Sequence, residues 1–134
     1  MGLKPADSKV AQIAIDFALE QAKNKVPYGR DRGFDCSSLI LAAYTKAGLK
    51  NIPPTTSAWV SSGKMRRVNS IADLKPGDAI ICSNSKNPTG HIIMYLGDNK
   101  YVHASSTYNR VYVDSFLTNS YHRNRLRLDL VFRP

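Results

Sequence analysis

The sequence has 134 residues, the length of one domain with a hydrophobic core of its own. Hydrophobic residues make up 43% and charged residues 22%, which is typical of a globular protein and excludes a disordered or fibrous one. Lysine and arginine number 19 against 10 acidic residues. The resulting net charge of +9 favours anionic partners such as nucleic acid, cell-wall polymers or acidic peptides, without choosing among them.

No apolar stretch is long enough to span a membrane, and Met1–Ser8 lacks the apolar centre of a signal peptide. The protein is therefore expected either to be delivered by another route or as part of a longer protein, or to work where it is made. The two cysteines, Cys36 and Cys82, are too few for a disulfide framework, and both thiols are expected to be reduced. Neither a CxxC nor an HExxH pattern occurs, so the sequence predicts no metal site.

The first half of the chain has helical spacing. Asp7 or Ser8 is predicted to cap a helix that continues to about Lys23, because apolar residues recur along one stripe. A loop over 25–32 follows. Asp35 is predicted to cap a second helix, in which Cys36 is the first residue.

The second helix is predicted to stop near Gly48, and a short third helix to begin at Thr56 or Ser57. After a turn over 75–78 the spacing becomes that of strands. Five strands are expected, over residues 79–82, 91–96, 100–105, 111–115 and 125–132. Helices followed by a meandering antiparallel sheet indicate a single α+β domain over residues 1–134.

The position of Cys36 favours a nucleophile. The positive end of a helix dipole stabilises a thiolate relative to a thiol. A cysteine nucleophile also needs a histidine as base and a third polar group that orients the imidazole. His91 and His103, in neighbouring predicted strands, are the candidates, whereas His122 is expected to be a surface or satisfied core histidine.

Cooperation between His91 and His103 depends on the turn between their strands. A two-residue turn at Asp98-Asn99 would place them on opposite faces, whereas a three-residue loop that includes Gly97 would place them on one face. A catalytic pair therefore predicts the three-residue loop.

Several motifs, taken together, resemble those of the NlpC-type cell-wall cysteine peptidases, which belong to the papain-like superfamily. The resemblance runs from about Ser8 to Pro134 and implies a papain-like fold, in which the helix that begins with the nucleophile packs on the sheet. The motifs are Phe34-Asp35-Cys36-Ser37-Ser38-Leu39, Leu74-Lys75-Pro76-Gly77-Asp78, Gly90-His91 leading to Tyr95-Leu96-Gly97, and His103-Ala104.

The resemblance implies that Cys36 is the nucleophile, His91 the general base and His103 the residue that orients it. It implies no cofactor. The residues predicted to bind substrate are Asp35, Tyr28, Ser37 and Trp59. Asp35 would bind a substrate amino group as well as cap the helix. Tyr28 would either donate to the oxyanion or pack beside the thiol, and Trp59 would either line the cleft or pack in the core.

The sequence departs from the family pattern at three places. Ser38 stands where many members have glycine, Thr55 stands where an arginine often follows the proline, and the loop between Tyr28 and Gly33 is shorter than is common. These changes concern the wall of the cleft and leave the three proposed catalytic residues in place.

The family resemblance implies an enzyme that hydrolyses peptidoglycan stem peptides at the cell wall or in the periplasm, typically at the γ-D-glutamyl bond to diaminopimelate or lysine. Nothing in the sequence suggests an obligate partner surface, so a monomer is expected. Five basic residues would suit an anionic wall polymer: Arg30, Arg32, Lys64, Arg66 and Arg67. One alternative is an amidase or acyltransferase that acts on a substrate outside the wall. Another is an inactive basic module that binds wall polymer or nucleic acid, although exposed aromatic residues are not clustered among the basic ones as single-strand binding needs.

Overall fold

The computed structural model describes residue 3 and residues 6–134. The remaining residues, on which part of the expectation about a signal peptide falls, lie outside the described residues. Within the described ranges, none of the helices has the length and hydropathy of a membrane span. The elements are α1 (Lys9–Lys23), α2 (Cys36–Lys46), α3 (Thr56–Ser61), η1 (Ile71–Asp73), β1 (Ala79–Cys82), β2 (His91–Gly97), β3 (Lys100–Ser105), β4 (Arg110–Ser115), α4 (Ser120–Arg123) and β5 (Leu126–Phe132).

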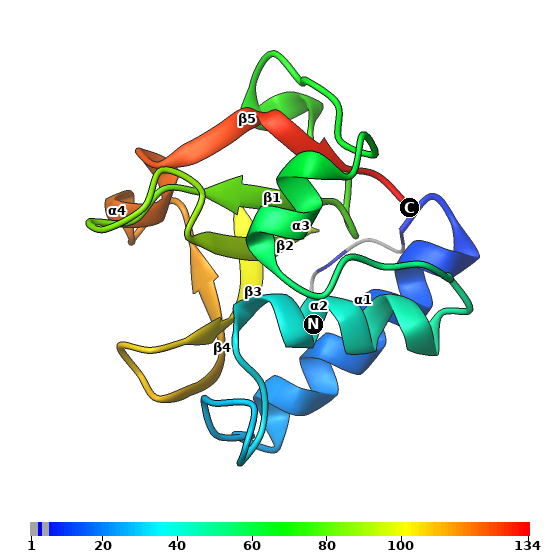
Figure 1. Cartoon of the computed structure of the whole chain (residues 1–134), viewed down its shortest axis with the longest axis vertical. Coiled ribbons are helices and arrows are strands. Elements are labelled where there is room, and N and C mark those ends of the chain that lie inside the picture. The colour runs from blue at the N-terminus through cyan, green and yellow to red at the C-terminus, as the bar shows by residue number, and fades with distance from the viewer. Residues whose placement is uncertain (1–2, 4–5) are drawn as a thin grey trace.

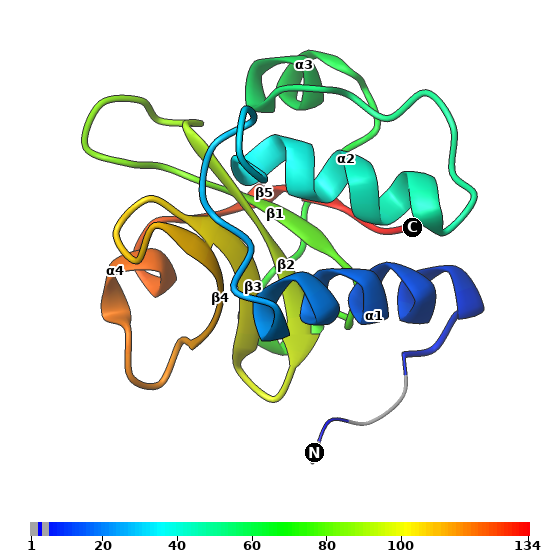
Figure 2. The same ribbon diagram turned by 90° about the horizontal axis from the view of Figure 1, so that it is seen from below.

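The five strands form one antiparallel sheet in the order β4-β3-β2-β1-β5 (Figure 1). The helices α1 and α2 lie side by side over one face of this sheet, and α4 lies on the other side (Figure 2). The predicted α+β class and the five-stranded antiparallel sheet are confirmed. The C-terminal strand β5 pairs with β1, so the edge of the sheet is completed by the last part of the chain.

Local capping chemistry begins both long helices where the sequence predicts. The Ser8 side chain accepts a hydrogen bond from the Ala11 amide at the start of α1. The Asp35 side chain accepts from the Ser38 amide at 2.9 Å, and the Ser38 hydroxyl accepts from the Asp35 amide at 2.9 Å. This reciprocal pair is a capping box, and it fixes Cys36 as the first residue of α2.

The hairpin between β2 and β3 corrects the predicted turn. Asp98 and Asn99 form a two-residue turn with positive φ angles of 53° and 62°, and Gly97 pairs with Lys100. A bulge between Tyr95 and Gly97 adds one residue to β2. The bulge restores the register that a three-residue loop would have given, so the predicted common face for the histidines holds although the predicted loop is wrong.

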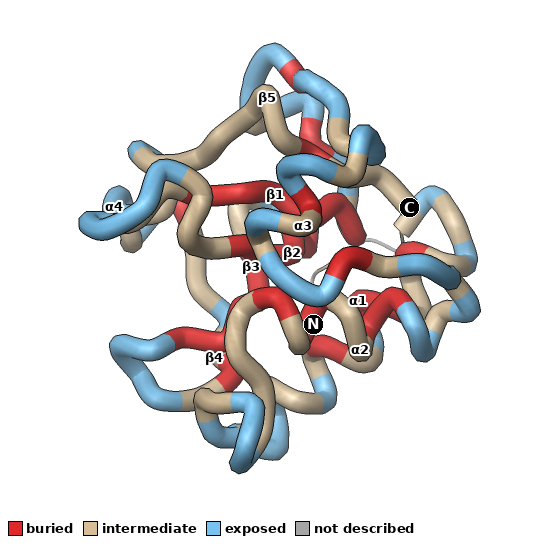
Figure 3. Tube along the Cα trace, in the orientation of Figure 1, coloured by how far each residue is buried: buried red, intermediate tan, exposed pale blue. Residues whose placement is uncertain are grey.

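Side chains that alternate along the strands fill two hydrophobic clusters, one on each face of the sheet, and the buried positions concentrate in its central strands (Figure 3). Ile92 and Met94 pack under α1 and α2, whereas Ile93 and Tyr101 belong to the opposite face. His91 and His103 fall in the same alternation as Ile93 and Tyr101. They therefore lie on the face of the sheet away from the two long helices.

Trp59 belongs to the core. Its side chain is fully buried and packs against Tyr44 and Phe132, with ring centroids 6.3 and 4.9 Å away. The prediction that Trp59 binds substrate is therefore wrong, because a residue without exposed surface cannot line a cleft. The alternative, core packing, is confirmed.

The segment before α2 is attached to the edge of the sheet. Val111 donates to the Val26 carbonyl and Tyr28 donates to the Asn109 carbonyl, so residues 26–28 run along β4. The loop can close at Gly33 only because glycine has no Cβ, since a Cβ there would overlap the carbonyl oxygen of Pro27. These contacts hold Tyr28 beside the start of α2.

Candidate active site

Cys36 lies where α2 meets the beginning of β2. Its thiol is partly buried, and the backbone amide of Ile92, the residue after His91, donates toward it. Burial raises the pKa of the Cys36 thiol, and the neighbouring carboxylate of Asp35 adds to this, while amide hydrogen bonds oppose it. The helix start acts in the predicted direction, because the amides of Cys36 and Ser37 lower the thiol pKa, but burial has the larger effect and the net pKa of Cys36 is raised.

The second cysteine differs from Cys36 in its surroundings. Cys82 is fully buried in the cluster on the far face of the sheet, and burial raises its thiol pKa strongly. Both cysteines are free. An electrophile is therefore expected to reach Cys36 first.

Alkylation by iodoacetamide tests the state of the thiol. We expect the rate at Cys36 to rise steadily with pH from neutrality to above pH 9, because the reactive thiolate forms only above the ordinary range of a thiol. Peptide mass spectrometry at several times gives the rate for each cysteine, and Cys82 serves as the internal control. A rate that is already constant below pH 7 would instead show a preformed thiolate.

His91 and His103 are brought together as predicted. His91 Nε2 lies 2.8 Å from His103 Nδ1, a hydrogen bond between the first residue of β2 and a buried residue of β3. Burial lowers the pKa of His91 to about 3, with a further contribution from His122, and holds the pKa of His103 well below its usual value. Both imidazoles are therefore neutral at neutral pH.

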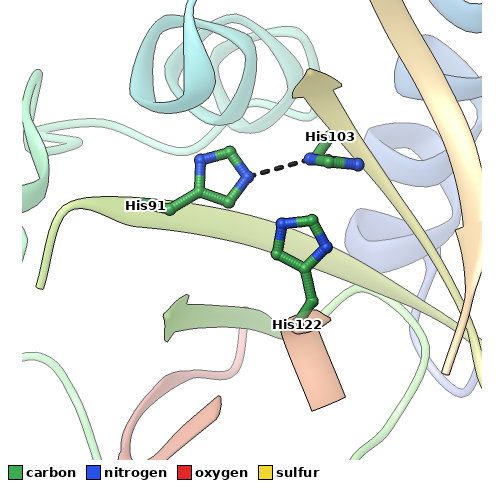
Figure 4. Close-up of side chains that lie close together, drawn as sticks. All are labelled: His91, His103 and His122. Carbon is green, nitrogen blue, oxygen red and sulfur yellow. Dashed lines mark hydrogen bonds between the residues drawn. The ribbon is translucent and has the colours of Figure 1, made fainter. Parts of the chain in front are cut away.

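His122 completes a cluster that the sequence does not predict. It comes from α4, and its ring stacks on that of His91 with centroids 5.3 Å apart. One ligand nitrogen from each of the three rings lies within 4.8 Å of the others. Figure 4 shows the rings of His91, His103 and His122 facing one another. His122 is partly buried and hydrogen-bonded to the Tyr101 hydroxyl, in keeping with the expected satisfied histidine. The sequence carries no signal for its contact with His91 and His103, because that contact depends on where α4 lies.

Asp35 is held by Arg30, one of the five basic residues expected to suit an anionic wall polymer. Arg30 donates from Nε to the Asp35 carboxylate at 2.7 Å and from Nη2 to the Ser37 hydroxyl at 3.2 Å, and it also bonds the carbonyl of Pro54. The pKa of Asp35 is lowered because the hydrogen bonds from Arg30 and Ser38 outweigh burial, which acts in the opposite direction. Arg30 therefore joins the start of α2 to the loop before α3.

The other predicted residues near the thiol differ in how far their side chains are exposed to solvent. Ser37 is buried, so its side chain supports the helix start and does not face solvent. Tyr28 is half-buried, and burial raises the pKa of its hydroxyl together with the charges of Cys36 and Asp35. Tyr28 thus keeps a proton to donate near the thiol. Arg32 donates to the Tyr28 carbonyl and to Asn109, which gives it a role in the loop.

A cavity of about 340 Å³ lies beside the histidines. His91, His103 and His122 form one wall, and residues 105–108 with Asn84 form others. Cys36 does not border this space. The cavity is therefore bordered by the histidine cluster and not by the thiol.

Acid is expected to destabilise the fold through these histidines. The His91 pKa is about 3 in the folded chain and about 6.5 in the unfolded one, so below pH 6.5 the unfolded chain binds the extra proton and the free energy of unfolding falls. Between pH 7 and pH 5 this amounts to about 2 kcal/mol for His91 alone. Urea unfolding at the two pH values measures the loss. The dependence should be smaller in His91→Gln, and an unchanged dependence in that variant would contradict the assignment.

Comparison with known proteins adds the family context. The model described as "NlpC/P60 family" matches residues 24–130. The peptidoglycan DL-endopeptidase CwlO of Bacillus licheniformis is 36% identical over 92 residues, which are 68% of this chain and 19% of that protein. The probable endopeptidase YafL of Escherichia coli is 32% identical over 104 residues, which are 73% of this chain and 41% of that protein.

A solved structure matches over nearly the full length of both chains. It is RipD of Mycobacterium tuberculosis, described as a non-catalytic NlpC/p60 domain protein adapted to a peptidoglycan-binding function. The TM-score is 0.69 at 22% identity, and the match covers 94% of this chain and 98% of that one. This likeness concerns the fold. The chain spans less than half the length of the curated relatives CwlO and YafL.

Proposed function

Because this chain belongs to the NlpC/P60 family, we propose that it is a cysteine peptidase that hydrolyses peptidoglycan stem peptides at the bacterial cell wall. The observation that carries the proposal is the hydrogen bond of 2.8 Å between His91 and His103, at the strand end where the Ile92 amide meets the Cys36 thiol. The name of CwlO, a peptidoglycan DL-endopeptidase, supports the γ-D-glutamyl bond to diaminopimelate or lysine as the one cleaved.

In the proposed mechanism the thiol and the imidazole are both neutral before substrate binds. His91 Nε2 carries a proton and donates it to the lone pair of His103 Nδ1, which leaves His91 Nδ1 as the acceptor. Figure 4 shows this nitrogen pointing away from the other two rings. The Cys36 proton moves to His91 Nδ1 as the sulfur attacks the carbonyl carbon.

The tetrahedral intermediate then collapses. His91 gives its proton to the leaving amine nitrogen, the C–N bond breaks, and a thioester on Cys36 remains. Water adds to the thioester with His91 as base and releases the acid. The Tyr28 hydroxyl and the backbone amide of Cys36 would donate to the oxyanion, as helix N-termini do in other hydrolases.

Substrate recognition is proposed at the start of α2. Part of the Asp35 carboxylate remains exposed beside the thiol, although Arg30 pairs with it. An amino group of the stem peptide would share this carboxylate with Arg30. Lys64, Arg66 and Arg67, which lie elsewhere on the surface, would favour encounter with the anionic wall.

The test is mass spectrometry of purified peptidoglycan after incubation with the protein and with Cys36→Ser. The proposal expects new peptide termini at one stem-peptide bond with the unaltered protein and none with Cys36→Ser. If walls of several chemotypes yield no new fragments, the proposal is overturned. Sedimentation with walls without cleavage would favour a binding module, and transfer of the acyl group to an added amine would favour an acyltransferase.

A further inference from the structure

Three imidazoles from separate elements direct one nitrogen each toward a common point. His91 comes from β2, His103 from β3 and His122 from α4. One nitrogen from each ring lies within 4.8 Å of the other two. Figure 4 shows His91 Nε2, His103 Nδ1 and one nitrogen of His122 at the centre of the cluster. A hydrogen-bonded pair needs only two rings, so the pairing of His91 with His103 does not account for the third.

The outer nitrogen of His122 is already engaged. The Tyr101 hydroxyl lies 2.8 Å from His122 Nδ1, and Tyr101 is paired across the sheet with Asp114, whose carboxylate faces the same hydroxyl. We assign the Tyr101 proton to the side that faces this carboxylate, so that the hydroxyl oxygen accepts from Nδ1–H. This tautomer leaves the lone pair of His122 on Nε2, directed into the cluster.

A metal-binding histidine usually donates its other ring N–H to an acceptor that fixes its tautomer and orientation. The Tyr101 hydroxyl oxygen is such an acceptor for His122. We propose that His91, His103 and His122 form a binding site for a divalent transition-metal ion of the zinc class. Three neutral imidazoles with one open position suit Zn²⁺, whereas Mg²⁺ prefers oxygen ligands. Metal binding is a different function from the proposed hydrolysis, although both use His91 and His103.

The cluster needs only a small adjustment to hold the ion. Bonds of about 2.0–2.1 Å in tetrahedral geometry place nitrogens about 3.4 Å apart. The His91–His103 pair, at 2.8 Å, would open slightly, and the third ring, within 4.8 Å, would move inward. The cavity of about 340 Å³ on the same side provides an entry path and room for water as the fourth ligand.

Bound metal would also stop the proposed hydrolysis, and this part rests on the proposed function. A neutral imidazole that gives its Nε2 lone pair to a metal ion carries its proton on Nδ1. His91 would then have no acceptor for the Cys36 proton. The ion would therefore act as a reversible inhibitor that leaves Cys36 itself unoccupied.

Calorimetric titration of the purified protein with Zn²⁺ tests the site directly. We expect one ion per chain, equal affinity in Cys36→Ser, and no heat of binding with Mg²⁺. Affinity should fall at least about 10-fold in His122→Gln, which removes a ligand, and by about 10-fold in Tyr101→Phe, which removes only the support for that ligand. Circular dichroism verifies that the variants are folded, and Tyr101→Phe gives a second test if His122→Gln is not.

The outcomes separate the two proposals. Absence of stoichiometric Zn²⁺ binding, or binding that is unchanged in both His122→Gln and Tyr101→Phe, overturns the metal site whether or not the protein cleaves peptidoglycan. Binding that is lost in Cys36→Ser overturns it as well, because the thiol would then be a ligand. If the wall shows no cleavage but Zn²⁺ binds with the expected pattern, the metal site stands and the hydrolytic proposal fails.

Discussion

Replacement of His91 by glutamine is expected to lower kcat/KM for a stem-peptide substrate about 1000-fold. Glutamine has nearly the length of histidine and keeps a polar end in the cluster, but it cannot accept the thiol proton at neutral pH. The binding of substrate at Asp35 is unaffected, so the loss should fall mainly on kcat. The rate is measured by monitoring release of the free amine with mass spectrometry.

Variants of His103 are the matched comparison for His91→Gln. In His103→Asn a carbonyl oxygen can still accept from His91 Nε2, so the loss in kcat/KM should be about 10-fold, whereas His103→Ala should lose about 100-fold. The pH at which the rate reaches half its maximum should also shift in His103→Ala, because the charged form of His91 loses its acceptor. Equal rates for the asparagine and alanine variants would contradict an orienting role.

Replacement of Arg133 by methionine is expected to lower the free energy of unfolding by about 3–5 kcal/mol. Asp78 is buried, with 1% exposed, and accepts from Arg133 Nε at 2.9 Å and from Nη2 at 2.7 Å. Removal of the guanidinium leaves a buried carboxylate with the Lys75 amide as its remaining donor. Urea unfolding followed by tryptophan fluorescence measures the change, because Trp59 lies in the core.

A double variant tests the cause of that loss. Asp78→Asn in the Arg133→Met background removes the uncompensated charge and should recover more than half of the lost stability. The exposed ion pair between Lys75 and Asp7 is the matched control, and Lys75→Met should change the free energy of unfolding by about 0.5 kcal/mol or less. A similar loss in both single variants would show that packing, and not the buried charge, determines the result.

The helix starts could be predicted from sequence because their causes are local. Asp35 and Ser38 form the capping box within four residues, and the apolar spacing of α1 needs no distant partner. Strands β1 and β3 have the predicted bounds, because turn residues limit them on both sides. The pairing of His91 with His103 was expected from the spaced motifs, and the register that allows it is the one found, although a bulge and not a longer loop produces it.

The features that sequence could not give depend on distant contacts. The raised pKa of Cys36 results from burial under tertiary structure, and His122 reaches the cluster only because α4 lies over β2 and β3. Arg30 could be recognised as basic, but its bonds to Ser37 and Pro54 join segments that no local pattern connects. Trp59 was ambiguous for the same reason, since core and cleft aromatics look alike in sequence.

The hairpin shows a different kind of failure. Asp98-Asn99 has the residues of a two-residue turn, but a regular ladder beside such a turn would separate the histidines, so the sequence favours the longer loop. The bulge before Gly97 makes the ladder irregular, so the two histidines share a face in spite of the two-residue turn. A residue count across a turn therefore predicts which face a side chain occupies only when the ladder beside it is regular.

The pairing of β1 with β5 has a consequence for synthesis of the protein. A nascent chain on the ribosome that has emerged only as far as β4 contains Cys36, His91 and His103 but lacks the strand that covers the edge of β1. Such an open edge is prone to pair with other chains. A ribosome-bound chain of this length is thus expected to aggregate more readily than one in which β5 has paired with β1.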